Sequence, residues 1–163
     1  MVPDWLFSMV LWLHLFSAIV FIGGSFFIWF VVWPVSFDLS LSEKDRTMMV
    51  GKFSKRFALF TNLSVLVLIP TGLALAYFDF GLHPSLSDPA FEILLLKAAT
   101  VVVALSLMYY NNLHHAKKIV KMIMEKKMDD VAKMRKTAHF ISYVTLGLLI
   151  LITVFAAMIQ VYP

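Results

Sequence analysis

Polar residues are few in the long apolar stretches of this chain, and these few are the candidates for chemistry. His14 and Lys97 each lie inside an apolar run. Three further histidines, His114, His115 and His139, lie near the ends of such runs, among basic residues. Neutral imidazole is a common ligand of haem iron and of copper, and a buried ammonium group pairs with an anion. The residue types therefore indicate a metal or haem site, provided that the fold brings them together.

The composition places these residues in a membrane protein. Of the 163 residues, 61% are apolar and 15% are charged, whereas soluble domains average about 45–50% and about 25%. The mean hydropathy is +0.85, and a globule of this length leaves much of its surface exposed to solvent. A soluble enzyme, a disordered chain and a disulfide-linked domain are excluded. The absence of cysteine also excludes thiolate zinc sites and iron–sulfur clusters.

Four stretches are long enough to cross a hydrocarbon layer of roughly 30 Å, which takes about 20 apolar residues. They lie at about 5–33, 57–78, 91–115 and 138–161. The first has no basic segment before it and no small-residue cleavage site, so we expect a retained span and not a signal peptide. The sequence thus predicts an all-α integral membrane protein, a four-helix up-down bundle forming a single transmembrane domain over residues 1–163.

The basic residues predict the orientation of this bundle. Five of the 14 Lys and Arg residues lie between the first two spans, and eight lie between the third and fourth. The two ends of the chain and the 79–90 connection carry none. Because basic loops stay in the cytoplasm, both termini are expected outside. The same alternation favours the lipid bilayer as the partner and argues against binding to nucleic acid.

Parts of the basic connections are predicted to be helical. Ser42 resembles a helix cap before a short helix through Met49. Residues 116–127 continue the third helix, with a turn expected near Asp129 and Asp130. Four methionines in this region could form a soft-metal site, but their helical spacing among lysines is more typical of an interfacial apolar face; they are Met122, Met124, Met128 and Met134.

Depth along the helices brings the candidate residues to one level. His14 and Lys97 each lie five residues outward of mid-span, or roughly 7.5 Å at the helical rise. Pro70–Gly72 in the second span reaches a similar height, where proline permits a kink and glycine permits close approach. We therefore expect three helices to converge in the outer leaflet. The alternative is that His14 only bonds to a neighbouring helix and Lys97 snorkels to the headgroups.

These residues define the expected site. The cofactor-binding set is His14, Lys97, Ser17, Gly24 and Gly72, with small residues beside the imidazole; the Gly23-Gly24 pair also indicates close helix packing. Lys97 is expected to pair with a haem propionate. A second metal site is expected at His115 and His139, because adjacent His114 and His115 point about 100° apart and at most one of them faces His139. Solvated interfacial histidines are the alternative for this second set.

Three segments of the chain match the pattern of a known family: His14 to Gly24 followed by Trp33-Pro34, Phe53–Phe57 followed by Thr71-Gly72, and Glu92–Ala99 around Lys97. In these segments the chain resembles the CopD family of copper-resistance membrane proteins. The chain is also similar to the HemJ family of four-helix protoporphyrinogen oxidases in its first-helix histidine and third-helix lysine. It differs from HemJ in lacking Leu-Pro-Arg after the glycine and Asn-Glu-x-Pro in the last helix, which begins here with Arg135-Lys-Thr-Ala-His139. Both resemblances imply a bundle that handles a metal or a tetrapyrrole through His14, in a prokaryotic plasma (inner) membrane.

Four functions follow from these observations. The first is a haem b protein with a redox or electron-transfer role. Its partner would be a redox donor, a quinone or a subunit of a membrane complex, and a homo-oligomer is also possible. The second is copper transport or handling of the CopD type, with copper as the bound metal. The third is a porphyrinogen oxidase, which would make the protein a membrane oxidoreductase. The fourth is an accessory subunit of a membrane complex.

Overall fold

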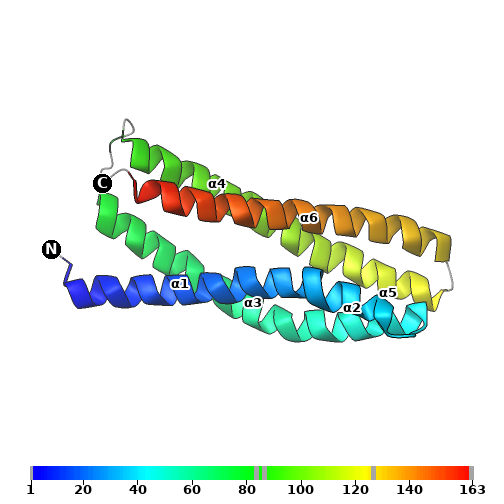
Figure 1. The fold of residues 1–163 in the computed structure, drawn as a ribbon. Helices are drawn as coiled ribbons and strands as arrows, with labels where there is room; N and C mark the ends of the chain where they lie inside the picture. Colours follow the sequence, from blue (N-terminus) through cyan, green and yellow to red (C-terminus); the bar gives the residue numbers. More distant parts are fainter. Residues whose placement is uncertain (1, 83–84, 86–87, 126–127, 162–163) are drawn as a thin grey trace. The chain divides into compact units, whose positions relative to one another are not determined.

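The structure, a computed structural model, describes residues 2–82, 85, 88–125 and 128–161, and within these ranges every regular element is helical (Figure 1). The elements are α1 (Asp4–Phe27), the π-helical turn η1 (Ile28–Val32), α2 (Trp33–Asp38), α3 (Glu43–Phe80), α4 (Pro89–Tyr110), the π-helical turn η2 (Asn111–His115), α5 (Ala116–Met124) and α6 (Met128–Ile159).

Four of the resulting helical segments are long and apolar enough to cross a membrane: Asp4–Asp38, Lys44–Phe80, Pro89–His115 and Lys133–Ile159. The prediction of an all-helical protein with four spans is therefore confirmed. Each of the four long helices begins before its apolar stretch, because polar side chains do not prevent the backbone hydrogen bonds of a helix from forming.

Contacts divide the chain into two compact units, Met1–Pro84 and Ser85–Pro163. In the first unit α1 packs against α3, and in the second α4 packs against α6. Each unit is a pair of helices joined at one end, and we call them the first hairpin and the second hairpin (Figure 1).

The first hairpin begins its second helix at a capped position. The Ser42 hydroxyl accepts a hydrogen bond from the backbone N–H of Asp45 at 3.2 Å, which confirms the predicted cap. The expectation of a short helix ending at Met49 is wrong, since α3 continues to Phe80. Only one glycine, and no proline, lies between Met49 and Phe57, and one glycine in a helix costs only about 1 kcal/mol. At the far end, Gly81 ends the helix with a φ of 69°, which glycine adopts readily.

The second hairpin begins at Asp88, whose carboxylate accepts from the N–H of Ala90 at 2.9 Å, with Pro89 at the first helical position. As expected, the helix continues past the apolar stretch, through η2 into α5. The turn expected near Asp129 and Asp130 is misplaced: both residues lie in α6, and α5 already ends at Met124.

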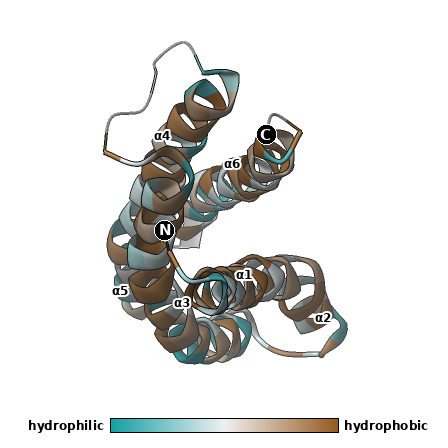
Figure 2. Ribbon diagram, turned by 90° about the vertical axis from the view of Figure 1, so that its left-hand side faces the viewer, coloured by the Kyte–Doolittle hydropathy of each residue, from teal (hydrophilic) through white to brown (hydrophobic). Residues whose placement is uncertain are grey.

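Both hairpins bury small hydroxyl side chains and expose many large apolar ones. Apart from His115, the buried polar residues are small and bear hydroxyls; they are Ser17, Ser36, Thr61, Ser64, Ser142 and Thr145. Many large apolar side chains are exposed, among them Ile19 at 69% and Leu66 at 70%, and apolar residues line the helices in both hairpins (Figure 2). Small residues let helices approach closely in lipid, and large apolar ones face the lipid tails. This arrangement is that of a multi-pass membrane protein.

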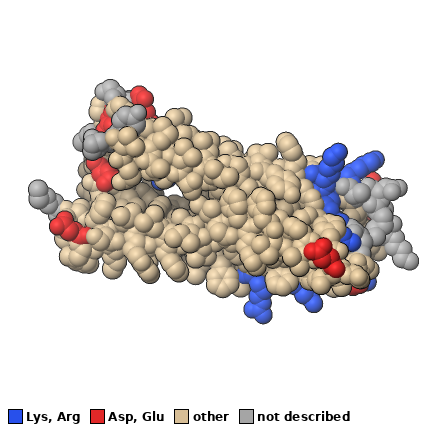
Figure 3. Space-filling model, in the orientation of Figure 1, with Lys and Arg blue, Asp and Glu red and all other residues tan. Residues whose placement is uncertain are grey.

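Charge is also unevenly distributed within each hairpin. Lys and Arg gather toward the end where its helices are connected (Figure 3). In the first hairpin they lie in Lys44–Arg56, and in the second they lie in α5 and the first turns of α6. Asp4 and Asp79 lie at the opposite end of the first hairpin, and Asp88 and Glu92 at the opposite end of the second.

Candidate functional site

The first hairpin holds the imidazole of His14 against α3. His14 Nδ1 lies 2.9 Å from Thr71 Oγ1. Thr71 Oγ1 in turn lies 2.6 Å from the carbonyl oxygen of Val67. A hydroxyl has a single proton, which Thr71 donates to that carbonyl, so Thr71 accepts from the N–H at His14 Nδ1. In a neutral imidazole the lone pair then lies on Nε2.

The position of Thr71 follows from its own helix. Pro70 has no N–H, so the regular backbone bonding of α3 is interrupted there. The hydroxyl of Thr71, the next residue, bonds to Val67 O and also lies 3.3 Å from Leu68 O. These bonds to the preceding turn hold the hydroxyl in the orientation in which it meets His14.

Gly72 lies against the edge of the same imidazole. A Cβ placed on Gly72 would lie 3.1 Å from His14 Cε1 and 3.7 Å from Nδ1, so a larger residue would displace the ring. The proximity of His14 to Pro70–Gly72, predicted from their depths, is therefore confirmed. Binding of a cofactor there stays a prediction.

The other predicted residues of this hairpin contribute in different ways. Ser17, one turn from His14, is buried. Gly24 is covered by the ring of Phe57, which occupies the space that a Cβ would need, whereas Gly23 has nothing within 4 Å. Gly24 thus lets α1 and α3 pack closely, and this contact gives no support to a direct role in binding a cofactor.

Lys97 lies in α4 of the second hairpin and is partly exposed. Its predicted pairing with a haem propionate stays a prediction.

Two histidines of the second hairpin, His114 and His115, contact the ring of Tyr110. His114 stacks on Tyr110 with ring centroids 5.3 Å apart and an interplanar angle of 18°. His115 meets the same ring at 5.3 Å but nearly edge-on, at 75°, and is buried. His139 in α6 is partly exposed. Within the described ranges no three or more His, Asp or Glu side chains gather in a way that could hold a metal ion, so the expected His115 and His139 site gains no further ligand of these types there.

Sequence reasoning did not include Thr71 and Asn111 in the site. Asn111 donates through Nδ2 to the Ala138 carbonyl at 3.1 Å and to Ser142 Oγ at 2.8 Å, which ties η2 to α6. The signal for Thr71 was a hydroxyl directly after an intrahelical proline at the level of a histidine.

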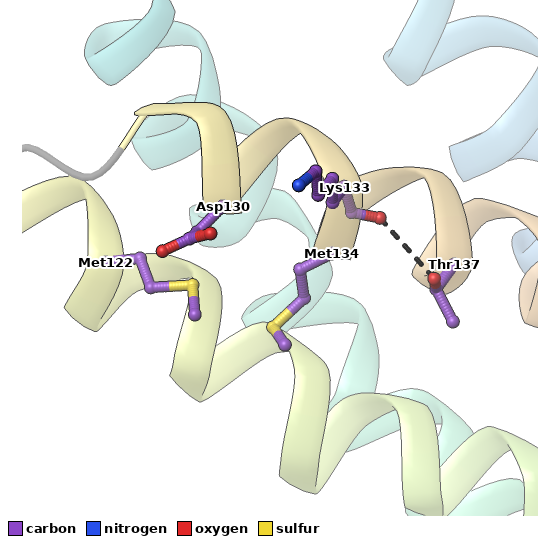
Figure 4. Close-up of a pocket in the computed structure, with 5 residues that line it drawn as sticks. All are labelled: Met122, Asp130, Lys133, Met134 and Thr137. Carbon is purple, nitrogen blue, oxygen red and sulfur yellow. Dashed lines mark hydrogen bonds between the residues drawn. The ribbon is translucent and has the colours of Figure 1, made fainter.

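The methionines serve packing between α5 and α6. Met122 and Met134 line a shallow groove with Asp130, Lys133 and Thr137 (Figure 4). Both also pack on an apolar cluster formed by Ile119, Val131 and Ala138. Met124 is 78% exposed, and the side chain of Met128 lies outside the described residues. These contacts support the interpretation as an apolar face.

Fold and site together define an all-helical, multi-pass membrane protein with a fixed imidazole inside its first hairpin. No family model, no curated protein and no solved structure matches the chain.

Proposed function

We propose that the protein binds one haem b, with His14 Nε2 of the first hairpin as an axial ligand of the iron, and that it transfers electrons in the membrane. The observation that carries the proposal is the hydrogen bond from His14 Nδ1 to Thr71 Oγ1 at 2.9 Å. Histidines that bind metals almost always donate their other ring N–H to an acceptor, which sets the tautomer and the ring orientation.

A single fixed imidazole suits haem better than a bare copper ion. The porphyrin supplies four nitrogen ligands, so the protein needs to provide only one or two axial ligands. A copper ion takes its ligands from the protein, and a site for soft Cu(I) would include the thioether sulfur of methionine. When bound, the haem supplies one-electron chemistry. His14 binds it, Thr71 orients the imidazole, Gly72 leaves the ring edge uncrowded, and Lys97 neutralises a propionate.

We also propose that the four helices form an up-down bundle with both termini outside, in a prokaryotic plasma membrane. The support is the gathering of Lys and Arg toward the connected end of each hairpin, which the positive-inside rule assigns to the cytoplasm. In this orientation His14 lies in the outer leaflet, where a redox donor, a quinone or a partner subunit would exchange electrons with the haem.

The test is the absorption spectrum of protein purified from haem-replete cells. We expect a Soret band that is lost or shifted in His14→Ala and unchanged in the matched variant His114→Ala. Stoichiometric copper without a Soret band would replace haem with the copper function, and bound porphyrin without iron would favour the porphyrinogen oxidase. Protein with neither cofactor would leave an accessory subunit in which His14 only packs.

A further inference from the structure

The π-helical turn of the second hairpin carries two buried polar atoms without partners among the described residues. These are Asn111 Oδ1 and His115 Nδ1. His115 is only 9% exposed. Buried polar atoms nearly always have a hydrogen-bond partner, so each exception calls for an explanation. Short π-helical turns inside α-helices also occur frequently at functional sites.

The hydrogen bonds of Asn111 determine which of its atoms needs a partner. Ser142 Oγ donates its proton to the Ala138 carbonyl at 3.0 Å, so it is an acceptor toward Asn111. Both acceptors of the amide, Ala138 O and Ser142 Oγ, are therefore met by Nδ2. Turning the amide over would place Oδ1 against the Ala138 carbonyl oxygen, which has no proton to donate, and would lose that bond. Its oxygen, Oδ1, consequently requires a hydrogen-bond donor from elsewhere.

His115 presents the complementary requirement. A neutral imidazole has one N–H donor and one acceptor nitrogen, and when Nδ1 carries the proton it requires an acceptor. Asn111 and His115 are four residues apart, a spacing at which Cβ atoms on a helix lie about 5–6 Å apart. This spacing allows a single oxygen atom to lie between the two side chains. With the proton on Nδ1, that oxygen accepts a hydrogen bond from His115 and donates one to Asn111 Oδ1.

We propose that η2 is a binding site for a hydroxyl group, which accepts from His115 Nδ1–H and donates to Asn111 Oδ1. Water and the hydroxyl of a hydroquinone share this chemistry. A bound water of this kind would sit where the apolar part of α4 meets the basic α5, and a hydroquinone would place a redox carrier in the second hairpin. The site is independent of the haem proposed at His14.

Nuclear magnetic resonance of the full-length protein, labelled with ¹⁵N-histidine and held in lipid nanodiscs, tests the proposal. The His115 signal is identified by its loss in His115→Phe. We expect a protonated Nδ1 whose proton shows a cross-peak with water. If hydroquinone fills the site instead, added hydroquinone shifts this signal with saturation, and its dimethyl ether, which has no hydroxyl, does not.

Two variants test whether the hydroxyl bridges the two side chains. Asn111→Leu removes Oδ1, so the water cross-peak or the hydroquinone response at His115 should be lost. Ser142→Ala is the matched control: it removes an acceptor of Nδ2, leaves Oδ1 in place and should retain the signal. A response that persists in Asn111→Leu overturns the proposal. So does an unprotonated Nδ1, or a wild-type signal that responds to neither water nor hydroquinone.

Discussion

His14 of α1 and Thr71 of α3, 57 positions apart in the sequence, are joined by a hydrogen bond of 2.9 Å between the imidazole and the hydroxyl. The hydroxyl is itself fixed by the carbonyl of Val67. Two helices and one intrahelical proline thus determine the orientation of a single ring.

Replacing Thr71 by valine keeps the shape of the side chain and removes the hydroxyl. Because loss of such a supporting hydrogen bond typically costs about 10–100-fold in metal affinity, Thr71→Val should weaken haem binding by that factor in a haem titration of apoprotein. Thr71→Ser should restore most of it. Thr100→Val is the control, since Thr100 is on α4 and bonds to the Leu96 carbonyl of its own helix. Equal haem affinity in Thr71→Val and wild type would contradict this role.

Enlarging Gly72 should disturb the same ring from its edge. A Cβ at 3.1 Å from His14 Cε1 is tight enough to move the imidazole by a few tenths of an ångström, and a leucine side chain should displace it. We expect a small spectral change in Gly72→Ala and loss of the His14-ligated spectrum in Gly72→Leu. Gly51→Ala, where nothing lies within 4 Å, should leave the spectrum unchanged. Wild-type spectra in all three variants would mean that His14 is not a haem ligand.

Adjacent glycines of α1 should respond very differently to substitution. Gly24→Ala forces the Phe57 ring to move, and overpacking of this kind typically costs about 1–3 kcal/mol. Gly23→Ala adds a methyl where no atom lies within 4 Å and should be neutral or slightly stabilising. Thermal unfolding in detergent measures both.

The double variant Gly24→Ala/Phe57→Leu tests the assigned contact. Shortening Phe57 should recover part of the stability lost in Gly24→Ala, giving non-additive changes in the unfolding free energy. Additive losses would show that the contact does not limit the packing of α1 on α3.

Removing the charge of Lys97 should lower haem affinity without removing the axial ligand. Lys97→Met keeps an apolar stem of similar length. We expect a loss of about tenfold, or about 1.4 kcal/mol, as for a charge-assisted bond to a partly exposed group, with an unchanged Soret maximum. Lys118→Met, on the exposed face of α5, is the control. Equal haem affinity in Lys97→Met and Lys118→Met would show that Lys97 does not pair with the haem and only extends to the lipid headgroups.

The proposed orientation can be tested without background labelling, because the chain has no cysteine. In intact cells a membrane-impermeant maleimide should label Ser85→Cys and should label Lys118→Cys only after permeabilisation. Both positions are exposed in the structure. The opposite result would reverse the topology.

The sequence was sufficient to predict the four spans, because the thickness of a bilayer dictates the length of an apolar helix. It also predicted the cap at Ser42 and the extension of the third helix past His115. It did not predict that α3 continues without a break through Lys44–Arg56 to Phe80 or that α5 ends at Met124, because hydropathy does not report helix formation outside the apolar layer. The π-helical turns at Ile28–Val32 and Asn111–His115 also had no local sequence signal.

For the candidate site, the depth of each residue along its helix was enough to predict that His14 lies near Gly72. Helices that cross the same bilayer place residues of equal depth at the same level. The function of Thr71 could not be predicted in this way. Its hydroxyl acts only because it accepts a hydrogen bond from the His14 ring on another helix while donating its own proton to the Val67 carbonyl.

The His14–Thr71 bond lies within one hairpin, and this has a consequence for the biogenesis of the protein. Domains generally fold as units during synthesis, beginning from the N-terminal side. The first hairpin has its own basic connection and its own buried hydroxyls, so it can be inserted by the translocation machinery before α4 leaves the ribosome. We therefore expect the imidazole to be oriented on the nascent chain, before translation of the second hairpin is complete.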